Sequence, residues 1–174
     1  MKLRLARLDS PLGGLRLAID AQGLLRAVDF QDHDGHLHRG LRTRYGQCET
    51  AEGPAPAGIA ARFVRYFEGD LAALDDIPTA TAGTALQRQV WAALRGIPAG
   101  RTASYGELAR ALGYADPRMA IEIGAANAAN PLAIVVPCHR VIGKDGALKG
   151  YAWGLARKRW LLAHEGALAG AARA

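Results

Sequence analysis

Residues 1–30 alternate apolar side chains with polar or small ones at a period of two, which is the pattern of half-buried strands. The stretches DSPLGG and DAQG interrupt this alternation with residues that favour turns. We therefore expect short antiparallel strands over this segment. The apolar positions that carry the pattern are Leu3, Leu5, Leu15, Leu17 and Ile19.

The next segment, residues 31–57, contains Gly, Pro, Asp and His without a regular period, and we expect it to be mostly loop. Helical spacing returns between Ile59 and Phe67 and predicts a helix that ends at Glu68. Residues 70–83 include Pro and Gly and are predicted to form an extended linker. The residues expected on the buried face of the helix are Ala60, Phe63, Val64 and Phe67.

Two capping boxes mark helix starts in the second half of the chain. Thr84 with Gln87 opens one helix, and Ser104 with Glu107 opens a shorter one. Gly and Pro stop the first helix, and Gly113 closes the second. The expected buried face of the first helix consists of Leu86, Val90, Trp91 and Leu94.

A third helix is predicted after Asp116, which is a good N-cap, with Pro117 at the first helical position. Together with the preceding short helix it forms a helix-turn-helix pattern. Its sequence, MAIEIGAANAAN, is rich in Ala and Gly. Small side chains would let this helix approach another surface closely, but they are also compatible with ordinary packing against a core.

An apolar run follows over residues 134–136, and we expect it to be a buried strand ended by Pro137. Cys138 and His139 come directly after it. A Gly-rich loop then leads to a last predicted helix from Leu155 to Glu165, and the tail 167–174 is expected to fray.

The composition suits one sizeable domain or two small ones, since the chain has 174 residues of which 50% are hydrophobic. No stretch approaches the length of a membrane span, and the start MKLRLARLDS lacks the apolar core of a secretory signal. Nothing suggests that Cys48 and Cys138 pair. We therefore expect a protein of the reducing cytoplasm that does not contact membranes.

The charge is uneven along the chain. Residues 1–83 carry 10 Lys or Arg against 11 Asp or Glu, whereas residues 84–174 carry 12 against 5. A basic second half suits a polyanion such as nucleic acid. Charge alone, however, favours the simpler interpretation of a basic, well-solvated surface.

Cys138 is a candidate nucleophile because a strand end and a proline fix its approach and His139 stands beside it. A free thiol is only a few per cent ionised near pH 7, so this role requires a base. Glu165 ends the last predicted helix, where the helix dipole disfavours a carboxylate, which suggests a polar partner such as imidazole. The alternative from these residues alone is a buried inert thiol beside a hydrogen-bonded histidine.

The longer string NPLAIVVPCHRVIG, residues 130–143, resembles the signature of the O6-alkylguanine-DNA alkyltransferases. GTALQRQVWAALRGIPAGRTASYGELARALG and GYAWGLARKRWLLAHEG resemble the same family in order and spacing. The resemblance covers residues 83–166, whereas the earlier part agrees only in strand pattern and length. The motif PCHRV, in this sequence context, is highly specific for the family.

The resemblance implies a role for each residue that matches the motif. Cys138 matches the alkyl acceptor, His139 the residue that deprotonates it through a bound water, and Glu165 the carboxylate that holds this histidine. Asn130 matches the asparagine that braces the active-site turn. Tyr105 matches the tyrosine whose hydroxyl meets N3 of the flipped guanine.

Other matched positions imply contacts with the alkyl group or with DNA. Tyr151 and Lys158 match residues that line the alkyl pocket, and residues 117–129 match a recognition helix that lies in the minor groove. The expected substrate- or DNA-binding positions also include Arg118, Ile121, Ala125 and Trp153, together with the motif arginine Arg140, whose role we expect to be structural.

Three positions depart from the family pattern. Ile121 stands where many members have an arginine that fills the gap left by the flipped base, a role that an apolar wedge or Arg118 could share. Ala152 replaces a serine that binds the guanine O6. Trp153 replaces a glycine and should narrow the alkyl pocket.

The resemblance implies an α+β fold, with an RNase H-like antiparallel sheet and helix over residues 1–80. A mainly helical DNA-binding and alkyl-acceptor domain with a helix-turn-helix follows over 81–166. It implies a monomer without cofactors that acts once on O6-alkylguanine, and possible activity on O4-alkylthymine, in double-stranded DNA. A thioether on Cys138 offers water no electrophilic carbonyl, so the protein is consumed.

Other functions remain open alternatives. A helix-turn-helix sensor of alkylated DNA would bind without accepting the group, although family relatives of that kind lack the cysteine. A cysteine hydrolase using Cys138 and His139 would turn over. A zinc site is disfavoured, because the spacing matches no standard structural site. The residues that raise the question of zinc are His33, His36, His38 and Cys48.

Overall fold

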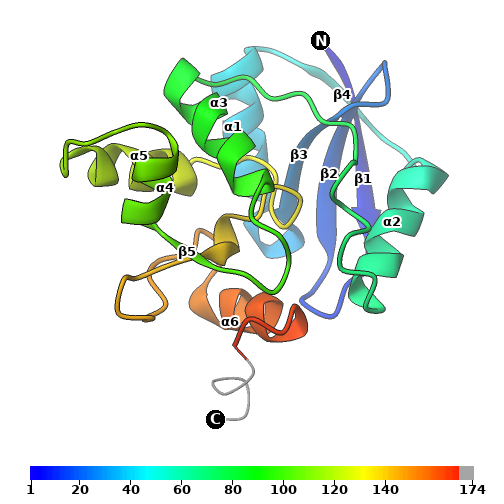
Figure 1. Cartoon of the computed structure of the whole chain (residues 1–174). Coiled ribbons are helices and arrows are strands. Elements are labelled where there is room, and N and C mark those ends of the chain that lie inside the picture. Colours follow the sequence, from blue (N-terminus) through cyan, green and yellow to red (C-terminus); the bar gives the residue numbers. More distant parts are fainter. Residues whose placement is uncertain (169–174) are drawn as a thin grey trace. The chain divides into compact units, whose positions relative to one another are not determined.

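The predicted strands are present and belong to a four-stranded sheet of order β3-β2-β1-β4 (Figure 1). β1 (Lys2–Leu8), β2 (Leu15–Asp20) and β3 (Leu25–Phe30) pair antiparallel in sequence order. The sheet is mixed, which corrects the purely antiparallel expectation, because β4 (Glu49–Glu52) runs parallel to β1. Every residue of β2 is buried, so the sheet is covered on both faces.

The expectation of a loop over residues 31–57 is wrong. After a short 3-10 turn, η1 (Gln31–His33), the chain forms α1 (Asp34–Tyr45) and then β4. Only Leu37 and Leu41 of α1 are buried, and they lie one turn apart. Two apolar positions are too few for a helical period to be recognised in the sequence. The two leucines pack on a core cluster with Leu3, Leu5, Ala18 and Ala27 of the sheet, so tertiary packing stabilises the helix.

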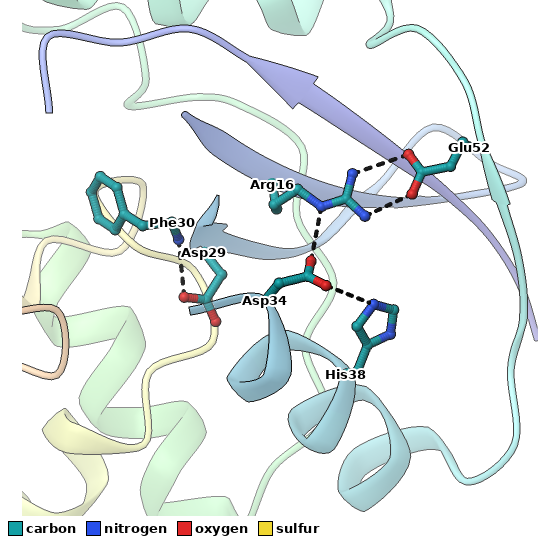
Figure 2. Close-up of polar contacts among 6 residues, drawn as sticks. All are labelled: Arg16, Asp29, Phe30, Asp34, His38 and Glu52. Atoms are coloured by element: carbon teal, nitrogen blue, oxygen red, sulfur yellow. Dashed lines mark hydrogen bonds and ion pairs between the residues drawn. The ribbon is translucent and has the colours of Figure 1, made fainter. Parts of the chain in front are cut away.

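A buried arginine of β2 links this strand to α1 and to β4 (Figure 2). Arg16 of β2 donates from both terminal nitrogens to Glu52 at 3.0 and 2.7 Å and from Nε to Asp34 at 3.0 Å. Asp34 also contacts His38, one turn along α1. Because the guanidinium is almost fully buried, these charge-assisted bonds compensate its loss of water.

α2 (Ala57–Phe67) forms where helical spacing predicts it, but with a different buried face. Ile59, Phe63 and Tyr66 are buried and Val64 is exposed. The following segment is not a plain extended linker, because turns over residues 71–76 bury several of its apolar side chains. Those buried around the turns are Ala73, Leu74 and Ile77.

Both predicted capping boxes are present. Thr84 caps α3 (Ala85–Arg95), and Ser104 caps α4 (Tyr105–Ala111). The buried indole of Trp91 in α3 donates to the carbonyl of Ala126 at 2.9 Å. This bond fixes α3 against the third helix of the segment.

That third helix, α5 (Met119–Ala128), begins slightly later than predicted. Asp116 accepts a hydrogen bond from the backbone N–H of Arg118 at 3.0 Å and so closes the turn that leads into the helix. Pro117 stands in that turn and not in the α-helix itself. Differences of this size are usual where a first turn is tighter than an α-helix.

The last elements carry the cysteine motif. Cys138–Arg140 form a 3-10 turn, η2, followed by β6 (Val141–Ile142), which pairs in parallel with β5 (Ala103–Ser104). α6 (Leu155–His164) ends at the C-cap Glu165, as predicted.

The structure is a computed structural model that describes residues 1–168, so most of the tail expected to fray lies outside the described residues. Two compact units divide the chain: residues 1–83 with 131–135, and residues 84–130 with 136 onward. Within the described part, no helix combines the length and apolar character needed to cross a membrane.

Candidate active site

The segment before Cys138 is buried but is not the strand that its apolar run predicted. Ile134 adopts a left-handed backbone with φ of 70°, and Val135 N–H bonds the carbonyl of Ala133 at 2.7 Å. A β-branched residue rarely adopts this conformation. Since an apolar run reports burial and not extension, the sequence could not distinguish this turn from a strand.

Asn130 holds this turn from below the cysteine. Its side-chain N–H donates to the carbonyl of Val136 at 2.8 Å, and the side chain also hydrogen bonds to the Cys138 sulfur. Asn130 is buried, so these bonds are shielded from water. Asn130 therefore contacts the residues on both sides of Pro137, and its bracing role stays a prediction.

His139 lies next to Cys138 and pairs with Glu165. The Nε2 atom of the imidazole and Oε1 of the carboxylate are 2.5 Å apart, and both side chains are fully buried. The other ring nitrogen, Nδ1, has no hydrogen-bond partner among residues 1–168. A neutral ring that donates from Nε2 presents a lone pair on Nδ1, and a proton can be accepted there.

Arg140 binds the same carboxylate from the other side. Its Nε donates to Oε2 of Glu165 at 2.8 Å and one terminal nitrogen donates to Oε1 at 3.1 Å. The second terminal nitrogen donates to the carbonyl of Ile97 at 2.5 Å. This arginine is buried, and all its observed bonds are internal, in keeping with the structural role expected for it.

The electrostatics favour an un-ionised thiol in the resting site. Burial raises the pKa of Cys138 to about 11, while the hydrogen bond from Asn130 and the charge of Lys158 oppose the rise. Burial also lowers the pKa of His139. Burial alone would raise the pKa of Glu165, but hydrogen bonds and charge from His139 and Arg140 lower it to about 2.

Lys158 of α6 is fully buried and holds the loop beside the cysteine. Its ammonium donates to the carbonyl of Val141 at 2.6 Å and to those of Lys149 and Gly150 at 3.4 Å. Burial lowers the pKa of this lysine, and a charge on Cys138 would raise it. Lys158 therefore positions the loop and supplies positive potential at the sulfur.

Tyr105 also lies within electrostatic reach of Cys138. Burial raises the pKa of its phenol, the charge on Cys138 raises it further, and a hydrogen bond from Asn127 lowers it. The sequence reasoning missed Asn127, a buried amide of α5 that the alanine-rich pattern around it hides. An amide that donates to the phenol oxygen leaves the hydroxyl proton available to a substrate.

The loop before α6 brings together two of the residues expected to line the alkyl pocket. The rings of Tyr151 and Trp153 meet edge to face with centroids 5.2 Å apart. Trp153 is buried, whereas Ala152 between them is exposed. The indole therefore occupies interior volume beside the lysine-held loop.

The outer face of α5 carries the remaining expected DNA contacts. Ala125 and Ala128 are exposed and small, and Ile121 projects among them with 76% of its surface exposed. Arg118 is exposed too, but its guanidinium pairs with Asp116 at 2.9 Å. Apart from Glu122 and Arg118, the exposed residues of this face are apolar.

Two histidines of the histidine-rich stretch contact carboxylates. His36 lies 2.6 Å from Asp29, and His38 lies 3.3 Å from Asp34. Over residues 1–168, no three His, Cys, Asp or Glu side chains gather in a way that could hold a metal ion.

Comparisons with known proteins identify the family of the chain. A family model described as the DNA-binding domain of 6-O-methylguanine DNA methyltransferase matches residues 85–167. A solved structure of Mycobacterium tuberculosis OGT in complex with DNA superposes with a TM-score of 0.75 at 36% identity, covering 95% of this chain and 93% of that one.

Curated relatives extend the similarity over nearly the whole chain. The methylated-DNA–protein-cysteine methyltransferase of Salmonella typhimurium is 45% identical over 170 residues, which cover 97% of this chain and 98% of the relative. The protein of the same name from Methanosarcina acetivorans is 40% identical, with 91% and 95% covered. The chain therefore belongs to the family of methylated-DNA–protein-cysteine methyltransferases.

Proposed function

We propose that this protein repairs DNA by moving an alkyl group from O6 of guanine onto Sγ of Cys138, once per molecule. The observation that carries the proposal is a buried cysteine flanked by a fully buried His139–Glu165 pair. Family membership supports the same reaction.

The reaction forms a sulfur–carbon bond and breaks the bond between that carbon and O6 of guanine. The thiol proton passes to Nδ1 of His139 through a water molecule, which would satisfy a buried nitrogen that has no partner in residues 1–168. The Tyr105 hydroxyl protonates N3 of the departing guanine, and the phenolate then regains the proton that His139 took from the thiol, so that the site returns to its neutral state. The product is a thioether on Cys138, which water does not hydrolyse.

The buried sulfur requires the damaged nucleotide to leave the duplex. Flipping costs a few kcal/mol and costs least for a mispaired base, which contributes to selectivity. We propose that α4 and α5 act as a helix-turn-helix that places α5 in the minor groove. The small outer residues of α5 allow close approach. The tuberculosis relative, which was solved in complex with DNA, supports DNA as the partner.

The remaining assignments follow from the same family. We propose an RNase H-like arrangement for the sheet-containing unit, a monomeric state and a cytoplasmic location. We also propose a domain boundary near residues 80 and 81. Tyr151, Trp153 and Lys158 would surround the alkyl group, and Ile121 and Ala125 would contact DNA.

The test is transfer of a labelled methyl group from O6-methylguanine in duplex DNA. Cys138→Ala should abolish transfer while leaving DNA affinity largely unchanged, and Cys48→Ala is the matched control that should keep both. DNA affinity should fall steeply as salt rises from about 50 to 200 mM, because phosphate contacts release counterions. Methyl transfer to the Cys138→Ala variant would refute the proposal.

A further inference from the structure

Glu165 does not serve His139 alone. Both of its oxygens accept from Arg140, at 2.8 and 3.1 Å, and one of them also pairs with the imidazole at 2.5 Å. All three side chains are buried. A guanidinium cannot lose its proton under ordinary conditions, so this carboxylate always has a cation against it.

The charges around His139 can be counted from the described contacts. Glu165 is negative, Arg140 and Lys158 are positive, and Cys138 is a neutral thiol at rest. A carboxylate with no other partner would attract a second proton to the imidazole. Here Arg140 cancels that carboxylate charge, and Lys158 opposes a further positive charge.

What Glu165 keeps is its function as a hydrogen-bond acceptor. It still holds the proton of His139 on Nε2 and leaves the Nδ1 lone pair ready to receive a proton. The charges and bonds that act on the sulfur itself come from Lys158 and Asn130. The arginine therefore acts on the cysteine only through Glu165 and His139.

We propose that Arg140 is a positioning residue that neutralises Glu165, so that the resting site holds a neutral imidazole beside a protonated thiol. Cys138 is then inert toward electrophiles in solution and reacts only with a base presented inside the site. The proposal rests on the proposed function, because a protein consumed by one reaction is wasted by any other alkylation. The arginine of the motif thus protects the acceptor until damaged DNA is bound.

The test compares Arg140→Met with the unchanged site, both in a Cys48→Ala background so that only Cys138 reacts. Iodoacetamide forms a sulfur–carbon bond with the thiolate and releases iodide, so its rate against pH reports thiol ionisation. The apparent pKa of Cys138 should fall by about one unit in Arg140→Met, which raises the rate near pH 7 about tenfold. Arg140→Lys keeps the positive charge, so the apparent pKa of Cys138 in this variant should remain close to that of the parent.

Arg16→Met is the control, because Arg16 is also a buried arginine and also donates to both oxygens of one carboxylate, that of Glu52, in this case from its two terminal nitrogens (Figure 2). This variant loses a buried guanidinium and its pairs with the solvent-exposed carboxylates of Glu52 and Asp34, so it should leave the dependence of the Cys138 rate on pH unchanged. An unchanged profile in Arg140→Met, or an equal shift in Arg16→Met, would overturn the role of Arg140.

A second measurement needs no variant and so does not depend on the folding of Arg140→Met. Nitrogen NMR of the intact protein should show His139 neutral, with its proton on Nε2, near pH 7. An imidazolium near pH 7 would overturn the proposal. Methyl transfer from DNA is measured in parallel: its absence refutes the proposed function, whereas transfer with an unshifted thiol refutes only the role of Arg140.

Discussion

Glu165, the residue that caps the C-terminal end of α6, lies 2.5 Å from Nε2 of His139 with neither side chain exposed. A helix C-terminus disfavours a carboxylate. The imidazole and the guanidinium of Arg140 compensate for this position, because together they occupy both oxygens. The pair fixes which imidazole nitrogen can accept the thiol proton.

Replacing this carboxylate should slow the chemistry without removing the acceptor. Glu165→Gln weakens the acceptor that holds the proton of His139 on Nε2 and leaves Nδ1 ready for the thiol proton, so single-turnover methyl transfer should slow by about 10²–10⁴-fold. Glu68→Gln, an exposed carboxylate at the end of α2, is the control and should react at the parent rate. If Glu165→Gln transfers methyl as fast as this control, Glu165 has no part in activation.

Acid should destabilise the fold in two steps. Burial lowers the pKa of His139, so below about pH 6.5 the unfolded chain binds more protons than the folded one and stability is lost. The pKa of Glu165 lies at about 2 in the folded protein, so its contribution is present above about pH 4.5 and is lost below it.

Urea unfolding measured between about pH 5 and 7 tests the first step. His139→Gln removes the titrating ring and should flatten the dependence of unfolding free energy on pH in this range. Parallel curves for the variant and the parent would show that His139 is not the group responsible.

The sequence was sufficient where local chemistry decides the structure. Capping boxes at Thr84 and Ser104 placed two helix starts, and the helix end at Glu165 was also predicted. The motif identified the residues that meet in the site. Local signals failed where tertiary packing decides: α1 is held by two leucines and an arginine from β2, and neither feature produces a helical period.

The turn before Cys138 shows a second limit. Its apolar run predicts burial correctly. The left-handed conformation of Ile134 and the hydrogen bond from Asn130 to Val136 depend on the folded turn, and local sequence patterns do not predict them. Charge sharing at Glu165 was likewise invisible, because the sequence gives no sign that Arg140 folds back onto the same carboxylate.

Trp153 should restrict the alkyl groups that the site accepts. Its buried indole packs edge to face on Tyr151 and fills space that a benzyl group would need. The protein should therefore repair O6-methylguanine readily but react poorly with free O6-benzylguanine. Trp153→Gly should raise the single-turnover rate with the benzyl compound, although truncating a buried indole costs about 3–5 kcal/mol of stability.

The control for this prediction is Trp160→Ala on α6, whose ring stacks on His164. It should leave benzyl reactivity low. Rapid reaction of the parent protein with the free benzyl base would show that Trp153 does not occlude the pocket.

Ile121 should assist nucleotide flipping less well than an arginine would. It projects from α5 as an apolar side chain, and Arg118 one turn earlier is already paired with Asp116. Ile121→Arg should raise the transfer rate on duplex DNA and leave the rate with a free base unchanged, because the aid acts only where a base must leave a stack.

Single-turnover rates for the Ile121→Arg variant and the parent, each measured on both substrates, separate these effects. Val64→Arg, at an exposed apolar residue of α2, is the control and should alter neither the duplex rate nor the free-base rate. A duplex rate that falls or stays the same in Ile121→Arg would place the gap-filling role elsewhere.

The central claim is that Cys138 accepts one alkyl group and keeps it. The most direct measurement mixes the protein with excess duplex DNA that contains O6-methylguanine and follows repaired guanine together with the intact protein mass. Repaired guanine should rise to one equivalent of protein and stop, while each chain gains one methyl group that peptide mapping assigns to Cys138. Repaired guanine in molar excess over protein, or a methyl group on any other residue, would contradict the account.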